Sequence, residues 1–207
     1  MSVGKQPRLH PVPQPEINAL LVRLASEGRT VVRLKGGDPM IFGRGSEEAE
    51  ELQAAGIPCE IVPGITAASG CSAAAGIPLT HRGLATGVRF VTGHCREDRP
   101  LDLDWAGLAD LDTTLVVYMG LANIPEITTR LIERGVPAST PALAISNGTT
   151  PRQREVLSTV STLRADVEKV GLEAPILFVI GRVAGMAAQS ATARRDQAAE
   201  SRHAAMG

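Results

Sequence analysis

The chain has 207 residues, and a chain of this length can bury about 70% of the surface that it exposes when unfolded. Hydrophobic residues make up 43% and charged residues 21%, with a formal net charge of −1, which excludes general disorder and a general polyanion-binding surface. No apolar run reaches the ~18 residues of a membrane span, and the first residues lack the order of a signal peptide. We therefore expect a cytoplasmic protein that binds neither membrane nor nucleic acid.

The first part of the chain alternates helix and strand patterns. Ile17, Leu20, Leu21 and Leu24 lie at i, i+3, i+4 and i+7, and Gly28 follows where a helix commonly ends. The next predicted elements are a strand at Thr30–Leu34, a helix at Ser46–Ala55, a strand at Cys59–Val62, a helix at Thr66–Ala75 and a strand at Val88–Thr92.

The second part repeats this alternation after a polar, acidic connection at 96–112. A strand at Thr114–Met119 precedes a helix that Asn123 can cap and that runs to Arg134. Further predicted elements are a strand at Ala142–Ser146, an extended segment at Gln153–Ser158, a helix at Leu163–Val170 and a buried strand at Pro175–Ile180.

Repeated strand–helix alternation predicts an α/β fold with mainly parallel sheets covered by helices, and ligands beyond the carboxyl ends of the strands. We place one domain at 1–113, a second at 114–184, and a flexible tail at 185–207. Cys59, Cys71 and Cys95 are odd in number and lack paired metal spacing, which favours reduced thiols. His94 beside Cys95 has no second close pair of ligands, so no metal is predicted.

The loop Gly36-Gly37-Asp38-Pro39 follows a β-branched run and suits a polar cofactor. Glycine lets a ligand approach the backbone closely, and a carboxylate can accept from hydroxyl or ammonium groups. The loop is neither GxGxxG nor GxxxxGK[ST], so the usual dinucleotide and triphosphate fingerprints do not apply. Taken alone, such a sequence is more often an ordinary turn.

Five segments that occur in this order favour a ligand-binding loop over an ordinary turn. They are "VVRLKGGDPMIFGRG", "VPGITAASGCSAAAGIPLTHRG", "VTGH", "VYMGL" and "NGTTPRQR". Together they closely resemble the uroporphyrinogen-III C-methyltransferases of the tetrapyrrole methylase family, from about Val3 to Val183. The resemblance implies a homodimeric, S-adenosyl-L-methionine-dependent enzyme that methylates uroporphyrinogen III twice and releases S-adenosyl-L-homocysteine. Its product would be precorrin-2, on the route to sirohaem or cobalamin. Two α/β domains with the cofactor between them are implied as well.

The resemblance also implies site residues. The cofactor contacts that it implies are Gly36, Gly37, Asp38, Ile41, Thr66, Ala67, Met119, Gly148 and, more weakly, Ala174. The residues that it implies on the tetrapyrrole side are Arg44, Glu47, Arg82 and Met119. From the residues alone, Thr66 and Ala67 would be read as a closely packed helix start, and Met119 as a core methionine.

Arginines suit this substrate because uroporphyrinogen III carries eight carboxylates and a planar guanidinium binds a carboxylate bidentately. Arg44 and Arg82 both stand beside glycine after apolar segments, which favours a site position over a solvated charge. Ser46 stands where the family commonly has glycine, and a helix-capping role would explain that difference.

Lys5 matches a family lysine with an acid–base role, as the reaction requires one proton to be removed after carbon methylation. The family's usual amino-terminal strand, Gly-Pro-Gly-Asp loop and proton-accepting aspartate have no counterpart in this sequence. We therefore expect the chain as given to form little precorrin-2. The alternatives are a non-catalytic tetrapyrrole-binding or dimer-forming remnant, and a methylase of a later corrin intermediate.

Overall fold

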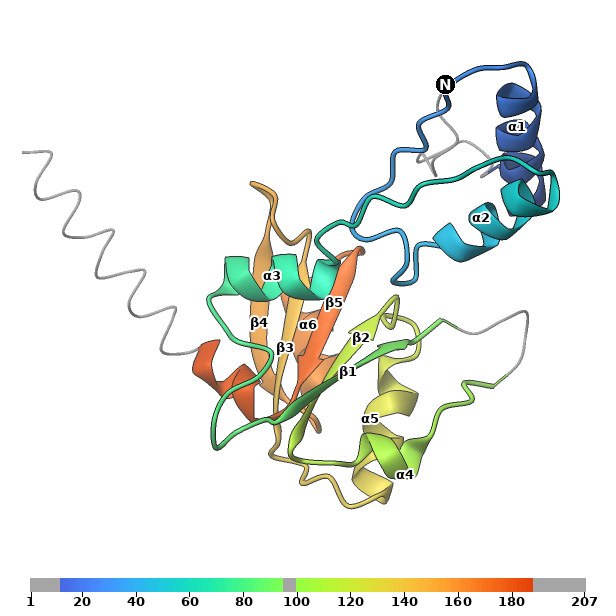
Figure 1. Ribbon diagram of the computed structural model, residues 1–207. Helices are drawn as coiled ribbons and strands as arrows, with labels where there is room; N and C mark the ends of the chain where they lie inside the picture. The colour runs from blue at the N-terminus through green and yellow to red at the C-terminus, as the bar shows by residue number, and fades with distance from the viewer. Residues whose placement is uncertain (1–11, 95–99, 188–207) are drawn as a thin grey trace, which may run out of the picture. The chain divides into compact units, whose positions relative to one another are not determined.

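The computed structural model describes residues 12–94 and 100–187 (Figure 1). Lys5, Cys95 and most of the predicted tail lie outside these ranges. The chain divides into two compact units, Met1–Thr66 and Ala67–Gly207, which are described separately below.

The N-terminal unit contains two helices among its described residues. Helix α1 spans Gln14–Ser26 and helix α2 spans Gly45–Ala54, and the two helices contact each other. Ile17 and Leu21 are the buried residues of α1, as the spacing of its apolar residues predicts. Both predicted helices are therefore confirmed to within a few residues.

The two strands predicted in this unit, Thr30–Leu34 and Cys59–Val62, do not form. Both segments lack a ladder partner among the described residues, and Val32, Leu34 and Val62 are 83%, 86% and 74% exposed. A β-branched sequence sets an extended preference, but a strand also needs a neighbour that satisfies its backbone groups. These predictions were wrong for that reason.

The C-terminal unit is built on a five-stranded sheet with the order β1-β2-β5-β3-β4 (Figure 1). The strands are β1 Gly87–Thr92, β2 Thr113–Tyr118, β3 Pro141–Ser146, β4 Arg154–Thr159 and β5 Ile176–Ile180. Each corresponds to a segment predicted as a strand or as extended.

The direction of the strands corrects one prediction. Only β1 and β2 run parallel, whereas β2–β5, β3–β5 and β3–β4 are antiparallel pairs. The sheet of an α/β fold is thus present, but it is not mainly parallel. The boundary between the compact units also differs from the predicted boundary at 113/114, because β1 pairs with β2 across it.

Helices cover both faces of this sheet. Alternate residues of β2, such as Leu115 and Val117, join a core with helices α4 Trp105–Leu108, α5 Ile124–Glu133 and α6 Leu163–Val170. Helix α3, Ala67–Ala75, contacts β5, and in Figure 1 it crosses in front of the sheet while α6 lies behind it. The short 3₁₀ helix η1, Arg182–Met186, follows β5. Among the described residues, no helix combines the length and apolarity needed to cross a membrane.

Candidate functional site

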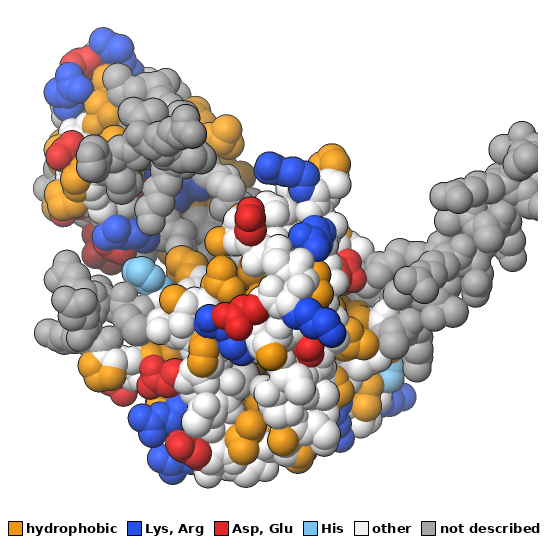
Figure 2. Space-filling model, turned by 180° about the vertical axis from the view of Figure 1, so that it is seen from behind, with side chains coloured by type: hydrophobic (Ala, Val, Ile, Leu, Met, Phe, Trp, Pro, Cys, Tyr) orange, Lys and Arg blue, Asp and Glu red, His pale blue; other side chains and the backbone are white. Residues whose placement is uncertain are grey.

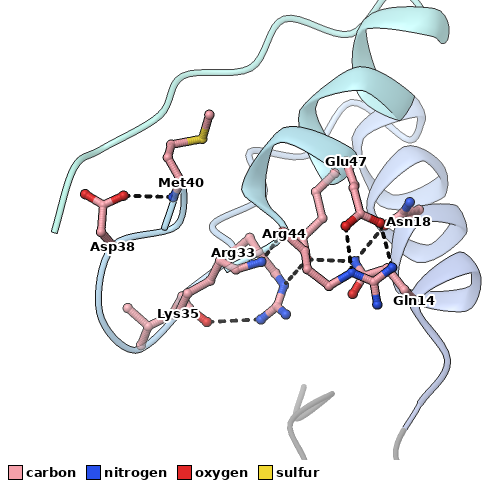
Figure 3. A network of polar contacts seen from close by, with 10 residues as sticks. Gln14, Asn18, Arg33, Lys35, Asp38, Met40, Arg44 and Glu47 are labelled. Atoms are coloured by element: carbon pink, nitrogen blue, oxygen red, sulfur yellow. Dashed lines mark hydrogen bonds and ion pairs between the residues drawn. The ribbon is translucent and has the colours of Figure 1, made fainter. Parts of the chain in front are cut away.

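The glycine loop is fastened at Asp38. Its Oδ1 accepts a hydrogen bond from Met40 N (2.8 Å; Figure 3), and its Oδ2 accepts one from Gly64 N (3.0 Å), so one carboxylate joins two loops. The loops lie so close that a Cβ at Gly64 would overlap the carbonyl oxygen of Gly37. Glycine is therefore required at Gly64 by the backbone of the neighbouring loop.

Gly36 and Gly37 leave their backbone open. A Cβ at Gly36 would meet no atom within 4 Å, and Gly37 has a φ of +79°. In the described ranges, no hydrogen bond engages the backbone N–H of either glycine. These two groups can therefore donate to a polar ligand. Ile41, predicted beside them, is half-buried, and its N–H donates to the carbonyl oxygen of Asp38 (3.3 Å).

The structure brings Arg44 and Glu47 together at the start of α2 (Figure 3). Arg44 Nε donates to Glu47 Oε1 (2.9 Å) and a terminal nitrogen donates to Oε2 (2.6 Å), a bidentate pair. The hydrogen bond to Glu47 raises the pKa of Arg44, although the partial burial of Arg44 opposes the shift. Both side chains remain about half exposed, at 52% and 49%. The pair presents a fixed guanidinium that a carboxylate ligand can reach.

The backbone around Arg44 is under strain. Phe42 and Arg44 have φ values of 53° and 60°, in the left-handed region that non-glycine residues rarely adopt. A Cβ at Gly43 or Gly45 would lie 2.6 Å from the carbonyl oxygen of Pro39. Left-handed non-glycine residues cluster at functional sites, which supports a binding role for this turn.

The predicted capping role of Ser46 is wrong. Helix α2 begins at Gly45, its N-cap is Arg44, and no side chain caps it by a hydrogen bond. Ser46 thus lies one residue inside the helix and cannot occupy the N-cap position.

A buried acid in α2 was not predicted as part of the site. Glu48 is 5% exposed and accepts from Lys35 Nζ (2.7 Å), Gln14 Nε2 (3.0 Å) and Arg33 Nε (3.4 Å). Burial alone would raise the pKa of Glu48, but the hydrogen bonds from Lys35 and Gln14 and the two positive charges outweigh it and lower the pKa. This cluster fixes the segment that leads into the glycine loop. Basic residues in a β-like run followed by an acidic helix were the only sequence signal.

In the C-terminal unit, Met119 follows β2 and is 53% exposed with a φ of 53°. It is therefore not a core methionine. Gly93, after β1, and Gly120 pack against each other, and a Cβ at Gly93 would lie 2.5 Å from the Cα of Gly120. Because β1 and β2 are parallel, Met119 stands where the carboxyl ends of two strands meet.

Gly148 and Ala174 lie on neighbouring loops. Ser146 Oγ donates to Glu173 O (2.6 Å), and Asn147 N donates to Pro175 O (3.0 Å), which joins the two loops on either side of these residues. A Cβ at Gly148 would overlap Cys71 Sγ of α3. Packing against α3 therefore explains the glycine without any ligand.

Of the remaining predicted residues, Thr66 and Ala67 lie at the start of α3. Thr66 is 7% exposed and precedes the helix, whereas Ala67 is its exposed first residue. Arg82 is exposed in the loop that leads to β1, and within the described chain it makes no ion pair. Lys5 lies outside the described residues. Among residues 12–94 and 100–187, no cluster of three His, Cys, Asp or Glu residues could hold a metal.

Comparison with known proteins gives consistent matches. The family model of the Tetrapyrrole (Corrin/Porphyrin) Methylases matches residues 2–164. The chain is 57% identical over 185 residues to the uroporphyrinogen-III C-methyltransferase of Paracoccus denitrificans, covering 89% of this chain and 64% of that relative. It is 59% identical over 181 residues to the siroheme synthase of Azotobacter vinelandii, covering 87% of this chain and 39% of that protein.

Solved structures show the same similarity. The uroporphyrin-III-C-methyltransferase of Thermus thermophilus matches with a TM-score of 0.72 and 43% identity, over 86% of this chain and 76% of that one. A crystal structure of the Thermus thermophilus enzyme complexed with S-adenosyl homocysteine matches with a TM-score of 0.70 and 39% identity, over 82% and 74% of the two chains. The chain therefore spans less than two thirds of the two curated relatives and about three quarters of these solved chains.

Proposed function

The chain belongs to the tetrapyrrole (corrin/porphyrin) methylase family, and we propose that it is an S-adenosyl-L-methionine-dependent C-methyltransferase acting on uroporphyrinogen III. The observation that carries the proposal is 57% identity over 185 residues to a relative named for that reaction. The siroheme synthases among its relatives favour a role on the route to sirohaem.

The cofactor proposal fits the open backbone of the glycine loop. The N–H groups of Gly36 and Gly37 donate to no described residue, and Asp38 fixes the loop through Met40 N and Gly64 N. Such donors suit the carboxylate and hydroxyl groups of an amino-acid nucleoside. The further cofactor residues that we propose are Ile41, Thr66, Ala67, Met119, Gly148 and Ala174.

The substrate proposal depends on local cations. Among the described side chains visible in Figure 2, Lys and Arg are interspersed with Asp and Glu, without one extended basic patch. A substrate with many carboxylates therefore needs a few fixed arginines. We propose that Arg44, held by Glu47, and Arg82 bind carboxylates, and that Met119 contacts the tetrapyrrole.

S-adenosyl-L-methionine would supply an electrophilic sulfonium methyl group. The chain's own contribution is then to orient the bound molecules, because correct placement lowers the barrier of a reaction between already reactive groups. Removal of a proton needs a base, and Lys5 is proposed for it on the family resemblance alone. We further propose a cytoplasmic homodimer.

Binding and methyl transfer together test the function. Calorimetry with S-adenosyl-L-homocysteine should show saturable binding to the 207-residue chain. With protein in excess over uroporphyrinogen III under anaerobic conditions, a labelled methyl donor should transfer label to the tetrapyrrole. The excess of protein detects even a single slow turnover.

A later corrin intermediate serves as the matched control substrate in the same assay. Label on that intermediate but not on uroporphyrinogen III would overturn the proposed substrate. Absence of both product binding and methyl transfer would overturn the proposed function.

A further inference from the structure

Tyr118, the last residue of β2, connects three segments at one end of the sheet. Its side chain is buried, with the residue 9% exposed, and its ring packs edge-on against Phe90 of β1 at a centroid distance of 5.9 Å. Its carbonyl oxygen accepts a hydrogen bond from Gly93 N (2.7 Å) in the turn after β1. Met119 follows Tyr118 directly in the chain, so its position depends on where Tyr118 is held.

The hydroxyl of Tyr118 reaches a third segment. It accepts a buried hydrogen bond from the backbone N–H of Ala68 (2.9 Å), fifty residues earlier in the chain. Ala68 is the second residue of α3, and the first N–H groups of a helix have no partner within the helix. The phenol therefore supplies one of the missing acceptors and ties the start of α3 to the end of β2.

This tie adds a directional contact to the packing of α3. The buried side chains of α3 are small, namely Ala68, Cys71, Ser72 and Ala75. Small side chains allow close approach, and their van der Waals contacts lack the angular dependence of a hydrogen bond. A hydrogen bond with a required distance and angle fixes that position at the helix start.

We propose that Tyr118 is a positioning residue that holds Ala67 and Met119 in the relative placement needed for cofactor binding. The inference rests on the proposed function, because both neighbours are cofactor contacts only under that proposal. Ala67 precedes the tied N–H by one residue, and Met119 follows the tyrosine by one residue. Tyr118 itself is covered by Phe90 and α3, so it acts through its neighbours.

Tyr118→Phe tests this role because it removes one oxygen and keeps the ring. We expect the affinity for S-adenosyl-L-homocysteine to fall severalfold, with about tenfold as the upper limit that one net hydrogen bond sets, because the bond is made in the unliganded chain as well. Hydrogen exchange at the Ala68 amide should become faster. The matched control is Thr128→Val, which removes a buried hydroxyl bonded to Ile124 O (3.0 Å) within α5 and should leave the affinity unchanged.

The outcomes separate the possibilities. Faster exchange at Ala68 with unchanged affinity would overturn the positioning role, as would an equal loss of affinity in Thr128→Val at the same loss of stability. Unchanged exchange at Ala68 would overturn the tie itself. If the unaltered chain binds no S-adenosyl-L-homocysteine, the positioning role fails, whereas the exchange measurement still reports whether the tie exists and methyl transfer still tests the proposed function.

Discussion

The Asp38 carboxylate holds two loops together, since its oxygens accept hydrogen bonds from Met40 N and Gly64 N. If the glycine loop binds the cofactor, Asp38 also faces that ligand. Asp38→Ala removes both acceptors and frees the two loops from each other. We expect binding of S-adenosyl-L-homocysteine, measured by calorimetry, to weaken by about 1–3 kcal/mol, the range for a polar partner left unmatched. The exposed Asp102 offers a control, and Asp102→Ala should bind as the parent does. Parent affinity in Asp38→Ala would contradict the role of this loop.

We predict that Arg44 binds a carboxylate of the tetrapyrrole through the geometry of its planar guanidinium as well as through its charge. Arg44→Lys keeps the charge but cannot form the two parallel hydrogen bonds now made to Glu47. We expect methyl transfer to uroporphyrinogen III to fall about tenfold or more, with unchanged affinity for S-adenosyl-L-homocysteine, as losing one charge-assisted bond of about 1.5–3 kcal/mol implies.

Arg164 provides the control for that substitution, because it pairs with Glu168 on the exposed side of α6. Arg164→Lys should leave methyl transfer at the parent rate. Equal rates in Arg44→Lys and the parent would remove Arg44 from the substrate site.

Single residues show what the sequence could not predict. Asn123 does occupy the N-cap position of α5, but its side chain donates to Gly93 O (2.7 Å) instead of capping the helix. The N-cap position of Asn123 can be predicted from local sequence. Its hydrogen bond to Gly93 O cannot, because Gly93 lies in a loop thirty residues earlier in the chain. Glu48 was missed for the same reason, since its partners Gln14, Arg33 and Lys35 come together only in the folded unit.

At the scale of elements, Gly148 and Cys71 link the loop after β3 to α3. Gly148→Ala places a methyl group where Cys71 Sγ lies, and overpacking of this kind costs about 1–3 kcal/mol. Cys71→Ala makes room for that methyl group. We expect the double variant to be less destabilised in urea unfolding than the sum of the two single variants. Additive effects would show that α3 and the loop do not press on each other.

The Glu48 cluster links helices α1 and α2 to the segment before the glycine loop, and it should respond to acid. The folded-state pKa of Glu48 is lowered, so its contribution to stability is complete above the ordinary glutamate value of about 4.3. That contribution is lost as the pH falls through the lowered pKa. We expect α1 and α2, followed by amide NMR during urea unfolding, to lose stability as the pH falls below about 4.3.

Glu48→Gln is the control because it removes the titrating group and keeps an acceptor. At neutral pH it should be less stable than the parent by about 1–3 kcal/mol, since the ammonium of Lys35 loses its charged acceptor. Its stability should change less over the same acid range. An equal acid response in the parent and in Glu48→Gln would contradict this assignment.

The predicted strands show when local sequence is sufficient to predict a strand. All the segments predicted as strands or as extended in the C-terminal unit were confirmed, because each finds a partner in one sheet. Thr30–Leu34 and Cys59–Val62 have similar side chains but no partner among the described residues, and their apolar side chains are exposed. Propensity predicts an extended backbone, and only pairing makes it a strand.

At the scale of the molecule, this difference should appear as unequal protection. We expect amides in 29–35 and 59–62 to exchange with solvent far faster than those of β2, β3 and β5, which are hydrogen-bonded in the ladders. Hydrogen exchange read by mass spectrometry resolves these segments. The first residues of β4, on the edge of the sheet, serve as an internal reference for a ladder with one open side. Protection of 29–35 equal to that of β5 would show that the segment is paired in solution.

The direction of the strands could not be predicted from sequence. Buried strands such as β2 and β5 are continuous apolar runs, which occur in parallel sheets and equally in the centre of an antiparallel arrangement. The prediction of a mainly parallel sheet followed from helix–strand alternation. The loop after β3 instead reverses the chain, so that β4 and β5 both run opposite to β1, β2 and β3.

The place of β5 in the sheet sets the order in which this protein can mature during synthesis. Strand β5 is the last strand along the chain, yet it stands between β2 and β3 and pairs with both. Until β5 has been made and has left the ribosome, only the β1–β2 and β3–β4 pairs of this sheet can form, and the edges of β2 and β3 that β5 later covers stay open. The sheet closes when Ile180 emerges. A nascent chain stalled before Ile176 should therefore bind chaperones. A chain that extends past Ile180 and has left the ribosome should no longer bind them.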